Sequence, residues 1–360
     1  MSLRPTTLPE LCEAVRSHAC VIPRGGGSKP ALTQWCPQAT LLELSSLSGM
    51  LEYEPDEYTF TAMGGTPLRE VEAALASHGQ YLPFDPPLSA AGATLGGTLA
   101  AAMNGAGRLR YGGVRDFIIG LAWVDGSSTV RRGGGKVVKN AAGFDFPKFF
   151  CGSLGCMGIV AEVSLKVFPA PAARASLVFS CRDMGDAAGC AAFICSQSWE
   201  VEALELLPGA EPQVIARFMG NAGPLEQRLA DMPRLAGRPA RRMSEAEADA
   251  FYAGLSALNI GAAEAPLARV AMTMADLPAL ERALPPAAVR HYSMAGHSAL
   301  ISGVEASELH VILTKLDLTG LVLRGACRHP RLGLPAATVL EAALKKALDP
   351  AGRFPDINAA

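Results

Sequence analysis

The sequence lacks several features that would assign it to other classes of protein. Aromatic residues make up only 6% of its 360 residues, and 32 basic against 34 acidic side chains leave a net charge of −2. This balance gives no electrostatic reason to expect a nucleic acid or an acidic membrane surface as partner. The apolar runs, of which Phe117–Val124 is an example, are far shorter than the roughly 20 residues that a membrane-spanning helix needs.

The nine cysteines are not spaced as metal ligands. None of them forms a C-x-x-C pair, which excludes the usual spacings of zinc and iron–sulfur sites. Most lie inside apolar runs, so we expect buried free thiols in a reducing compartment. The N-terminus has no basic start followed by an apolar stretch, so a secretion signal is not expected. These absences favour a cytoplasmic protein.

What the sequence has in abundance is glycine, with several of its 37 glycines in two clusters. Arg24–Pro30 reads RGGGSKP after a short apolar run, and Gly92–Gly107 reads GATLGGTLAAAMNGAG. Glycine allows positive φ angles and lets backbone N–H groups approach an anion closely. Two such segments predict a site for a large cofactor that contains a diphosphate. Taken alone, the first cluster could also be an ordinary Gly/Ser turn. Its residues match neither a Walker A loop nor a Rossmann fingerprint.

Local patterns predict helices and strands around these loops. Thr7–His18 predicts a helix with Thr7 as N-cap and Glu10 at the capping-box position. Thr66–His78 predicts a helix that is capped by Thr66 and ends at Gly79. The other elements expected in this half are strands at 19–23, 41–44, 58–62 and 159–168, and a hairpin around Asp125-Gly126.

A Pro-Ala-Pro segment at 169–171 is the best candidate for a domain boundary. After it we expect strands at 174–179, 201–207, 214–219 and 269–273, with helices at 183–196, from about 224 and at 277–284. This order is typical of a ferredoxin-like α+β layer, and no sequence repeat is evident. Thr338–Leu348 predicts a last amphipathic helix. Because the chain is too long for one ordinary core, we expect an α+β fold divided into 1–169, 170–337 and 338–360.

Further motifs follow the first loop in an order that resembles a known family. They are T-L-G-G-T at 94–98, Y-G-x-x-R-D at 111–116, Val124-Asp125-Gly126, G-G-x-V-V-K-N-x-A-G-[YF]-D at 134–145 and G-S-L-G-x-x-G-I at 152–159. With the RGGGS loop they cover about residues 20–170. The chain resembles FAD-dependent flavoproteins of the vanillyl-alcohol oxidase / p-cresol methylhydroxylase (PCMH) type, and among these the second, FAD-binding subunit of bacterial glycolate oxidases.

The resemblance implies a PCMH-type FAD-binding domain of two α+β subdomains at 1–169 and a smaller ferredoxin-like cap domain at 170–337. It also implies which residues contact FAD. They are Arg24, Gly25, Gly26, Gly27 and Ser28 at the pyrophosphate, Gly92, Thr94, Gly96, Gly97 and Thr98 along the diphosphate and flavin, and Gly158, Ile159 and Val160 along the flavin and ribityl chain. Several relatives attach the flavin through a histidine in the first loop, where this chain has Ser28 and Lys29. We therefore expect FAD to be bound non-covalently.

Three more positions carry weaker expectations. Cys156 stands where relatives more often have threonine, and a small buried side chain is expected there. Arg115 and Lys139 are candidates for contact with the flavin, and for Arg115 a local salt bridge with Asp116 is the alternative. The C-terminal tail lacks the F-N-P-G ending frequent in relatives, so we infer no flavin contact from it.

The histidines bear on whether the chain oxidises a substrate itself. Related oxidases of D-2-hydroxy acids carry histidine clusters in the cap that ligate a metal and accept the α-proton. Here His291 and His297 are close in sequence, but their spacing on a strand is expected to place them on opposite faces, and His329 is a further candidate. We therefore predict no metal site and name no catalytic residue.

The resemblance implies an FAD-binding redox subunit of a glycolate (2-hydroxy acid) oxidase or dehydrogenase complex. It would relay electrons beside a catalytic flavin subunit and an iron–sulfur subunit, in the cytoplasm or at the inner membrane through these partners. Two alternatives stay open. The chain could be a self-sufficient FAD-dependent oxidoreductase of a small hydroxy acid, or a non-redox scaffold subunit that retains the flavin fold.

Overall fold

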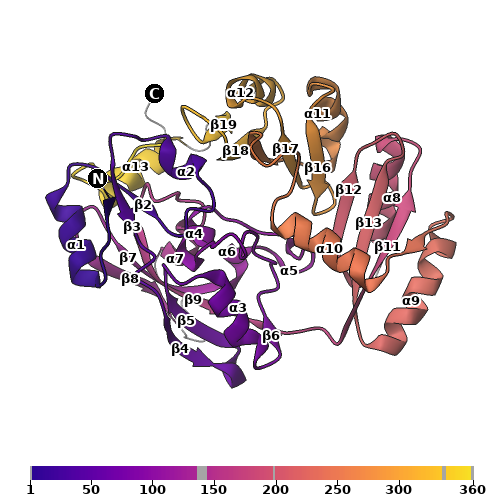
Figure 1. The fold of residues 1–360 in the computed structure, drawn as a ribbon, viewed down its shortest axis with the longest axis horizontal. Helices are drawn as coiled ribbons and strands as arrows, with labels where there is room; N and C mark the ends of the chain where they lie inside the picture. The colour runs from indigo at the N-terminus through magenta and orange to yellow at the C-terminus, as the bar shows by residue number, and fades with distance from the viewer. Residues whose placement is uncertain (1, 136–143, 198, 335–337, 358–360) are drawn as a thin grey trace. The chain divides into compact units, whose positions relative to one another are not determined.

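The structure separates into two units whose sequence ranges interleave. The computed structural model describes residues 2–135, 144–197, 199–334 and 338–357. The first unit comprises residues 1–104, 113–169 and 335–360, and the second comprises 105–112 and 170–334. Both units mix helices and strands (Figure 1), which confirms the α+β class. The Pro-Ala-Pro segment thus stands at the crossing from the first unit to the second, and the last helix lies with the first unit.

The first unit is built around two sheets. A parallel sheet has the order β1 (Ser2–Leu3), β3 (Thr40–Glu43), β2 (Val21–Arg24), and an antiparallel sheet has the order β4 (Met50–Glu54), β5 (Thr59–Met63), β9 (Ile159–Lys166), β7 (Ile118–Val124), β8 (Val130–Gly134). A short ribbon pairs β6 (Gln80–Tyr81) with β10 (Phe168–Pro169). The helices are α1 (Leu8–Ser17), α2 (Ala31–Gln34), α3 (Leu68–Ala76), α4 (Leu95–Ala100), α6 (Val114–Phe117), α7 (Phe146–Phe149) and α13 (Thr338–Leu348).

One apolar cluster holds parts of both sheets, α1 and the C-terminal segment together. The apolar side chains Leu11 and Val15 of α1 share a face of the helix and are fully buried there. The same cluster contains Val21 of β2, Ile159 of β9 and Phe354 from the C-terminal segment. Burial of this kind stabilises by about 1.5–3 kcal/mol for each large apolar side chain. The cluster therefore fixes β2, the strand that leads into the first glycine loop.

The two helix starts predicted in this unit differ in outcome. Thr7 caps α1 as expected, with its Oγ1 accepting a hydrogen bond from the Glu10 backbone N–H at 3.3 Å. Thr66 does not cap α3, which starts after Pro67. Instead the Thr66 hydroxyl is buried, donates to the Met63 carbonyl oxygen at 2.7 Å and accepts from the Gly49 N–H at 3.0 Å. A partner 17 residues upstream has therefore replaced the local cap.

The second unit contains one antiparallel sheet of nine strands. Its order is β14 (Arg241–Arg242), β11 (Ala173–Ser180), β13 (Gln213–Gly220), β12 (Val201–Leu207), β16 (Val289–Ser293), β17 (Ser298–Ser302), β15 (Leu267–Ala271), β18 (Thr319–Arg324), β19 (Arg331–Gly333). The helices of this unit are α5 (Arg108–Tyr111), α8 (Met184–Ser196), α9 (Ala222–Leu235), α10 (Glu245–Ser256), α11 (Leu277–Ala283) and α12 (Ala306–Lys315).

This sheet consists of two ferredoxin-like halves. In chain order β11, α8, β12, β13, α9, β14 form one βαββαβ set, and β15, α11, β16, β17, α12, β18 form a second. The halves meet where β12 pairs with β16, in register at Leu206 and Tyr292. The ferredoxin-like prediction is confirmed, and the strand expected at 269–273 and the helix expected at 277–284 open the second set.

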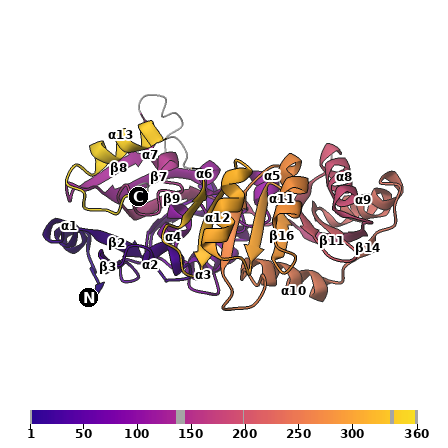
Figure 2. The same cartoon turned by 90° about the horizontal axis from the view of Figure 1, so that it is seen from above.

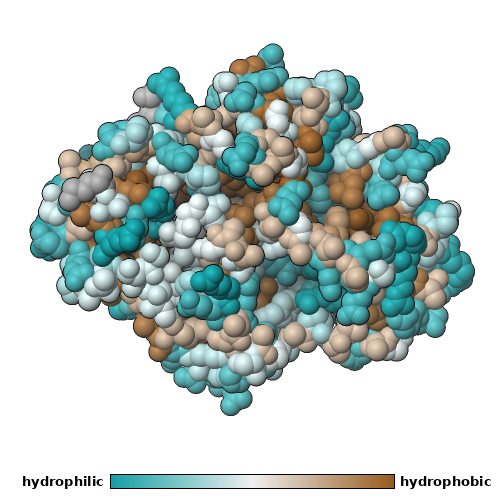
Figure 3. All heavy atoms as spheres, viewed as in Figure 1, coloured by the Kyte–Doolittle hydropathy of each residue, from teal (hydrophilic) through white to brown (hydrophobic). Residues whose placement is uncertain are grey.

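The helices of the second unit divide between the two faces of its sheet. Helices α8, α9, α11 and α12 cover one face, and α5 and α10 lie against the other (Figures 1 and 2). Helix α9 buries Leu225, Leu229 and Met232 on the sheet, and its outer side is hydrophilic (Figure 3). Within the described ranges, every helix is too short or too polar to cross a membrane.

Candidate cofactor site

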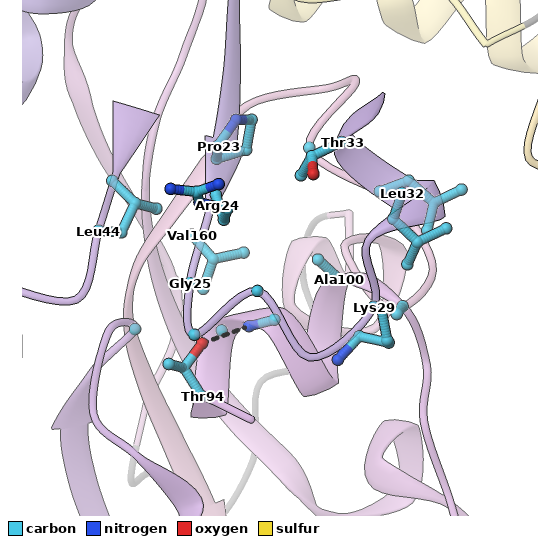
Figure 4. Close-up of a pocket in the computed structure, with 18 of the residues that line it drawn as sticks. Pro23, Arg24, Gly25, Lys29, Leu32, Thr33, Leu44, Thr94, Ala100 and Val160 are labelled. Atoms are coloured by element: carbon cyan, nitrogen blue, oxygen red, sulfur yellow. Dashed lines mark hydrogen bonds between the residues drawn. The ribbon is translucent and has the colours of Figure 1, made fainter. Parts of the chain in front are cut away.

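A pocket in the first unit lies where the two glycine clusters meet (Figure 4). Its empty space, measured out to the open mouth and including solvent, is about 710 Å³. Three stretches of chain, within 23–33, 94–101 and 154–160, form its walls together with Leu44 and Gly64. The lining residues are Pro23, Arg24, Gly25, Gly26, Gly27, Ser28, Lys29, Leu32, Thr33, Leu44, Gly64, Thr94, Gly96, Gly97, Ala100, Ala101, Leu154, Gly155, Gly158 and Val160.

The first glycine loop supplies hydrogen-bond donors to this pocket. It follows β2 directly, and Gly27 has a φ of 72°, in the region that favours glycine. The backbone N–H groups of Gly25, Gly26, Gly27 and Ser28 form no hydrogen bond with the described residues. Consecutive N–H groups without a protein partner are what a phosphate oxygen can accept from. The loop can therefore bind an anion through its backbone.

The second cluster brings its backbone close to this loop. A Cβ atom on residue 25 would lie 2.1 Å from Oγ1 of Thr94, and one on residue 26 would lie 1.7 Å from the carbonyl oxygen of Gly92. Glycine at 25 and 26 is thus required for the two loops to pack. At Gly97 the nearest atom to an added Cβ would be Oγ1 of Thr94 at 3.1 Å. This contact with the N-cap hydroxyl is tight, and no other atom outside α4 would lie within 4 Å of the added Cβ.

The start of α4 brings its backbone close to the pocket, but its backbone N–H groups already have hydrogen-bond partners. Thr94 is its N-cap, and its Oγ1 accepts from the Gly97 N–H at 3.3 Å (Figure 4). The Leu95 N–H donates to the Thr66 carbonyl oxygen at 2.9 Å, and the Gly96 N–H donates to the Gly64 carbonyl oxygen at 2.7 Å. These donors are already used. The anion donors of the pocket are accordingly those of the first loop.

Positive charge surrounds the loop. The lining includes Arg24 and Lys29, and no carboxylate among the described residues lines the pocket. Arg24 is held by Glu43, with Nη2 to Oε1 at 2.7 Å, and Arg4 binds the other oxygen of Glu43 at 2.7 Å. Burial raises the pKa of Glu43, but hydrogen bonds from Ser2 and the two guanidinium groups bring it below its ordinary value. Two cations thus share one anion, which leaves a net positive charge beside the pocket.

The pocket brings together most of the residues predicted to contact the cofactor. Of the thirteen, all but three line it. Gly92 packs against Gly26. The side chain of Ile159 lies in the apolar cluster around α1. Thr98 is fully buried, and its hydroxyl has no hydrogen-bond partner in the described part of the chain. Assigning any of the thirteen to FAD stays a prediction.

The apolar wall of the pocket was not predicted from the sequence. Leu32, Leu44 and Leu154 line it together with Gly64 and Gly155. The glycines had a signal, because Gly64 follows β5 in a Gly-Gly pair and Gly155 belongs to the G-S-L-G motif. The leucines had none, since an apolar side chain in a pocket and one in a core look alike in sequence.

Two of the weaker candidates, Cys156 and Arg115, do not line this pocket. Cys156 is buried, with its Sγ 3.8 Å from the Leu154 carbonyl oxygen. Arg115 donates to the Lys148 carbonyl oxygen at 2.9 Å, and Asp116 accepts from the Gly113 N–H at 2.8 Å, so each contacts backbone. Lys139 lies outside the described residues.

The histidines of the second unit lie in different surroundings. His291 is buried on β16, and its Nε2 is 2.7 Å from Oε2 of Glu205, whose Oε1 accepts from the Ser293 hydroxyl at 3.0 Å. His297 is exposed in the turn between β16 and β17, so the two do not occupy opposite faces of one strand as expected. His329 lies beyond β18. Over the described ranges, no three His, Cys, Asp or Glu residues are grouped as metal ligands.

A second hollow, in the second unit, has mixed charge. Arg174 and Arg217 line it and share the fully buried carboxylate of Glu202, at 2.7 and 2.8 Å. The Arg217 guanidinium also lies 4.2 Å from the ring centre of Tyr252. Further lining residues carry both signs, and they are Arg242, Glu245, Glu247 and Asp249. Because basic and acidic side chains both line this hollow, its charge favours neither an anionic nor a cationic ligand.

The residues of the first pocket fit a cofactor with a diphosphate. Free N–H groups and positive charge meet the requirement of the anion, and Leu32, Leu44 and Val160 provide apolar contact for a ring system. The absence of a side chain at Gly26 lets the first loop pack against Gly92 of the second cluster. The first glycine cluster is therefore better explained as part of a site for FAD than as an ordinary Gly/Ser turn.

Comparison with known proteins agrees with this fit. Residues 3–134 match the model of a family described as FAD binding domain. The chain is 39% identical over 170 residues to glycolate oxidase subunit GlcE of Escherichia coli, and 32% identical over 160 residues to glycolate oxidase subunit GlcD of Bacillus subtilis. These matches cover 47% and 44% of this chain but only 48% and 34% of the relatives. The chain therefore spans half or less of the length of these relatives.

A solved structure supports the fold over the whole chain. Alkyldihydroxyacetonephosphate synthase aligns with a TM-score of 0.72 over 98% of this chain and 76% of that protein, at 16% identity. At this identity the likeness concerns the fold alone. The family match over residues 3–134 and the pocket together identify an FAD-binding domain within the first unit.

Proposed function

We propose that this chain is the FAD-binding redox subunit of a glycolate (2-hydroxy acid) oxidoreductase complex, in which it relays electrons beside a catalytic flavin subunit and an iron–sulfur subunit. The observation that carries the proposal is the 39% identity with GlcE, a glycolate oxidase subunit. Other relatives bear the names D-2-hydroxyglutarate dehydrogenase, from Xanthomonas citri, and D-lactate dehydrogenase, from Saccharomyces cerevisiae. All three names refer to 2-hydroxy acids.

The residues of the pocket have defined tasks in this proposal. FAD, when bound, supplies a redox group that can accept electrons from the catalytic flavin subunit and pass them on. The N–H groups of Gly25–Ser28 bind its phosphates, and Arg24 and Lys29 offset their charge. Leu32, Leu44 and Leu154 exclude water from the rings. These tasks concern the holding of the cofactor, and none of them removes a proton from a substrate.

The arrangement of the histidines supports electron relay over independent catalysis. A base for the substrate must lie within hydrogen-bond reach of the proton that it removes. His291 is buried and bound to Glu205, while His297 is exposed in a turn. A self-sufficient oxidoreductase would need one of these side chains, or His329, for turnover.

The visible spectrum of the flavin tests this proposal. The purified chain is mixed anaerobically with glycolate, first alone and then with the catalytic flavin subunit. We expect the flavin of this chain to bleach only when the second subunit is present. Rapid bleaching by glycolate alone, lost on replacement of His291, would contradict the relay and establish the self-sufficient enzyme.

A variant without flavin distinguishes relay from scaffold. Gly97→Leu should reduce the space for FAD, because Gly97 lines the pocket and an added Cβ would meet only the Thr94 hydroxyl outside α4, at 3.1 Å. Assembled into the complex, this variant should abolish electron transfer from glycolate to an external dye. Undiminished transfer through a complex that contains the flavin-free variant would show that the chain is a scaffold.

A further inference from the structure

The C-terminal segment that follows α13 runs into the first unit and is tied to its backbone. Phe354 and Ile357 are 2% and 5% exposed, and Phe354 lies in the apolar cluster with Val21. The Arg353 carbonyl oxygen accepts from the Val21 N–H at 2.8 Å, at the start of β2. The segment therefore holds the strand that carries the first glycine loop.

Lys345, on α13, connects this segment to the opposite wall of the pocket. Its Nζ donates to the Cys156 carbonyl oxygen at 2.7 Å, to Oδ2 of Asp349 at 2.6 Å and to the Phe354 carbonyl oxygen at 2.8 Å. The Lys345 side chain is 14% exposed, and that of Asp349 is fully buried. An ammonium group has three donors, so these contacts use all of them.

Cys156 stands between two residues that line the cofactor pocket, Gly155 and Gly158. A Cβ on residue 155 would lie 2.5 Å from Cγ of Pro23, and one on residue 158 would lie 2.9 Å from the Val124 carbonyl oxygen. The two glycines have φ angles of 76° and 148°. The wall is thus closely packed on both sides of Cys156, so a shift of that carbonyl group moves residues that line the pocket.

We propose that Lys345 is a positioning residue for FAD. Through Cys156 it fixes the wall that contains Gly155 and Gly158, and through Phe354 and the Val21–Arg353 bond the same segment fixes the first glycine loop. A pocket held in its binding geometry before the ligand arrives binds more tightly, because less ordering has to accompany binding. This inference rests on FAD binding and not on the proposed substrate or partners.

Replacing Lys345 has two effects that the experiment must separate. Lys345→Met removes the donor to Cys156, and it also leaves the buried Asp349 carboxylate without its cation, which destabilises the folded chain. Leu75→Ala is the control for stability, because Leu75 is fully buried on α3 in the same unit and makes none of these contacts. Lys346→Met is the control for the loss of a charge from α13, since Lys346 is exposed next to Lys345.

The measurement is the Kd for FAD of the flavin-free chain, by quenching of flavin fluorescence, with the Tm of each flavin-free variant measured by circular dichroism. We expect Lys345→Met to bind FAD at least about tenfold more weakly than the parent chain, and both controls to bind within about twofold. Lys345→Gln, which keeps one N–H donor, is the second variant in case Lys345→Met does not fold. It should weaken binding in the same direction.

Two results would overturn the proposal. One is an unchanged Kd for a folded Lys345 variant. The other is an equal loss of affinity in Leu75→Ala at a matched Tm, which would show that Lys345 contributes stability alone. Neither measurement involves a substrate or a second subunit. Failure here therefore leaves the proposed redox function standing, and failure of the glycolate experiment leaves Lys345 as a determinant of FAD affinity.

Discussion

Gly26 and Gly92 lie so close together that a Cβ atom on residue 26 would stand 1.7 Å from the Gly92 carbonyl oxygen. The sequence motifs suggested that Gly26 and Gly97 both make room for a diphosphate. The structure separates their roles. Gly26 makes room for the neighbouring loop, whereas the space beside Gly97 belongs to the pocket.

Gly97→Leu should weaken FAD binding without unfolding the chain. The residue lies inside α4, where leucine is a better helix former than glycine by up to about 1 kcal/mol. Its side chain would occupy the pocket, and overpacking by about 1–3 kcal/mol corresponds to a loss of affinity of about tenfold to hundredfold. The Kd for FAD and the Tm of the flavin-free variant test this. Tight FAD binding by the variant would mean that the cofactor lies elsewhere.

Gly26→Ala should instead reduce stability before any ligand is present. The added methyl group meets backbone, which cannot rotate away, so one of the two loops has to move. We expect a lower Tm for flavin-free Gly26→Ala than for flavin-free Gly97→Leu. An unchanged Tm in the absence of FAD would show that the loops separate freely.

The parts of the site that the sequence predicted are local in the chain. The RGGGS loop and the cap at Thr7 depend on neighbouring residues, so motif and spacing were sufficient. Thr66 shows the limit of this reasoning. Its Thr-Pro context indicates a helix cap, but the hydroxyl bonds to Gly49, and only the folded chain brings these residues together. The tie between Lys345 and Cys156 spans 189 residues and has no local signal.

The joining of the two halves into one sheet was unpredictable for a similar reason. Each ferredoxin-like half has ordinary strand and helix patterns, and the halves share no evident sequence repeat. They join through the edges of β12 and β16, and the pairing of strand edges leaves little trace in side-chain alternation. The buried Glu202 was also unexpected, because the register of β12 on β13 shifts between Val201 and Ala203 beside it.

Glu202→Gln should destabilise the second unit strongly. The fully buried carboxylate accepts hydrogen bonds from Arg174 and forms an ion pair with Arg217, and neutralising it leaves two guanidinium groups without their shared anion. Removing one partner of a buried ion pair costs about 3–5 kcal/mol. Urea unfolding followed by circular dichroism measures the change.

Glu226→Gln is the matched control for this prediction. Glu226 also binds an arginine through both oxygens, Arg242, but both side chains are more than half exposed. Exposed pairs contribute little because water and salt screen them. We expect no measurable change in this variant. Equal losses in the two variants would mean that burial of Glu202 is unimportant.

Because of the Asp186–Arg238 pair, the stability of the second unit should fall at acidic pH. Hydrogen bonding by the Arg238 guanidinium, together with the Arg182 N–H, lowers the pKa of Asp186 from 3.8 to about 2. A lowered pKa in the folded state means that the contribution is complete above about pH 4 and is lost as the pH falls towards 2. Asp186→Asn should therefore be less stable than the parent chain at pH 6, and the difference should shrink between pH 4 and pH 2. If the difference in urea midpoint between Asp186→Asn and the parent chain did not change with pH, the charge of Asp186 would not be its cause.

Denaturation should release all of the flavin from this chain. Relatives with covalent flavin use a histidine in the first loop, and here that loop holds Ser28 and Lys29. Among the described residues, the pocket lining also contains no histidine, cysteine or tyrosine. The thiol of Cys156, close by in sequence, is buried next to the Leu154 carbonyl group and outside the lining. After acid precipitation the yellow colour should therefore remain in the supernatant, and mass spectrometry should find the chain at its unmodified mass. An adduct of the mass of FAD would require a nucleophile from outside this lining, and would mean that the flavin ring extends beyond the pocket described above.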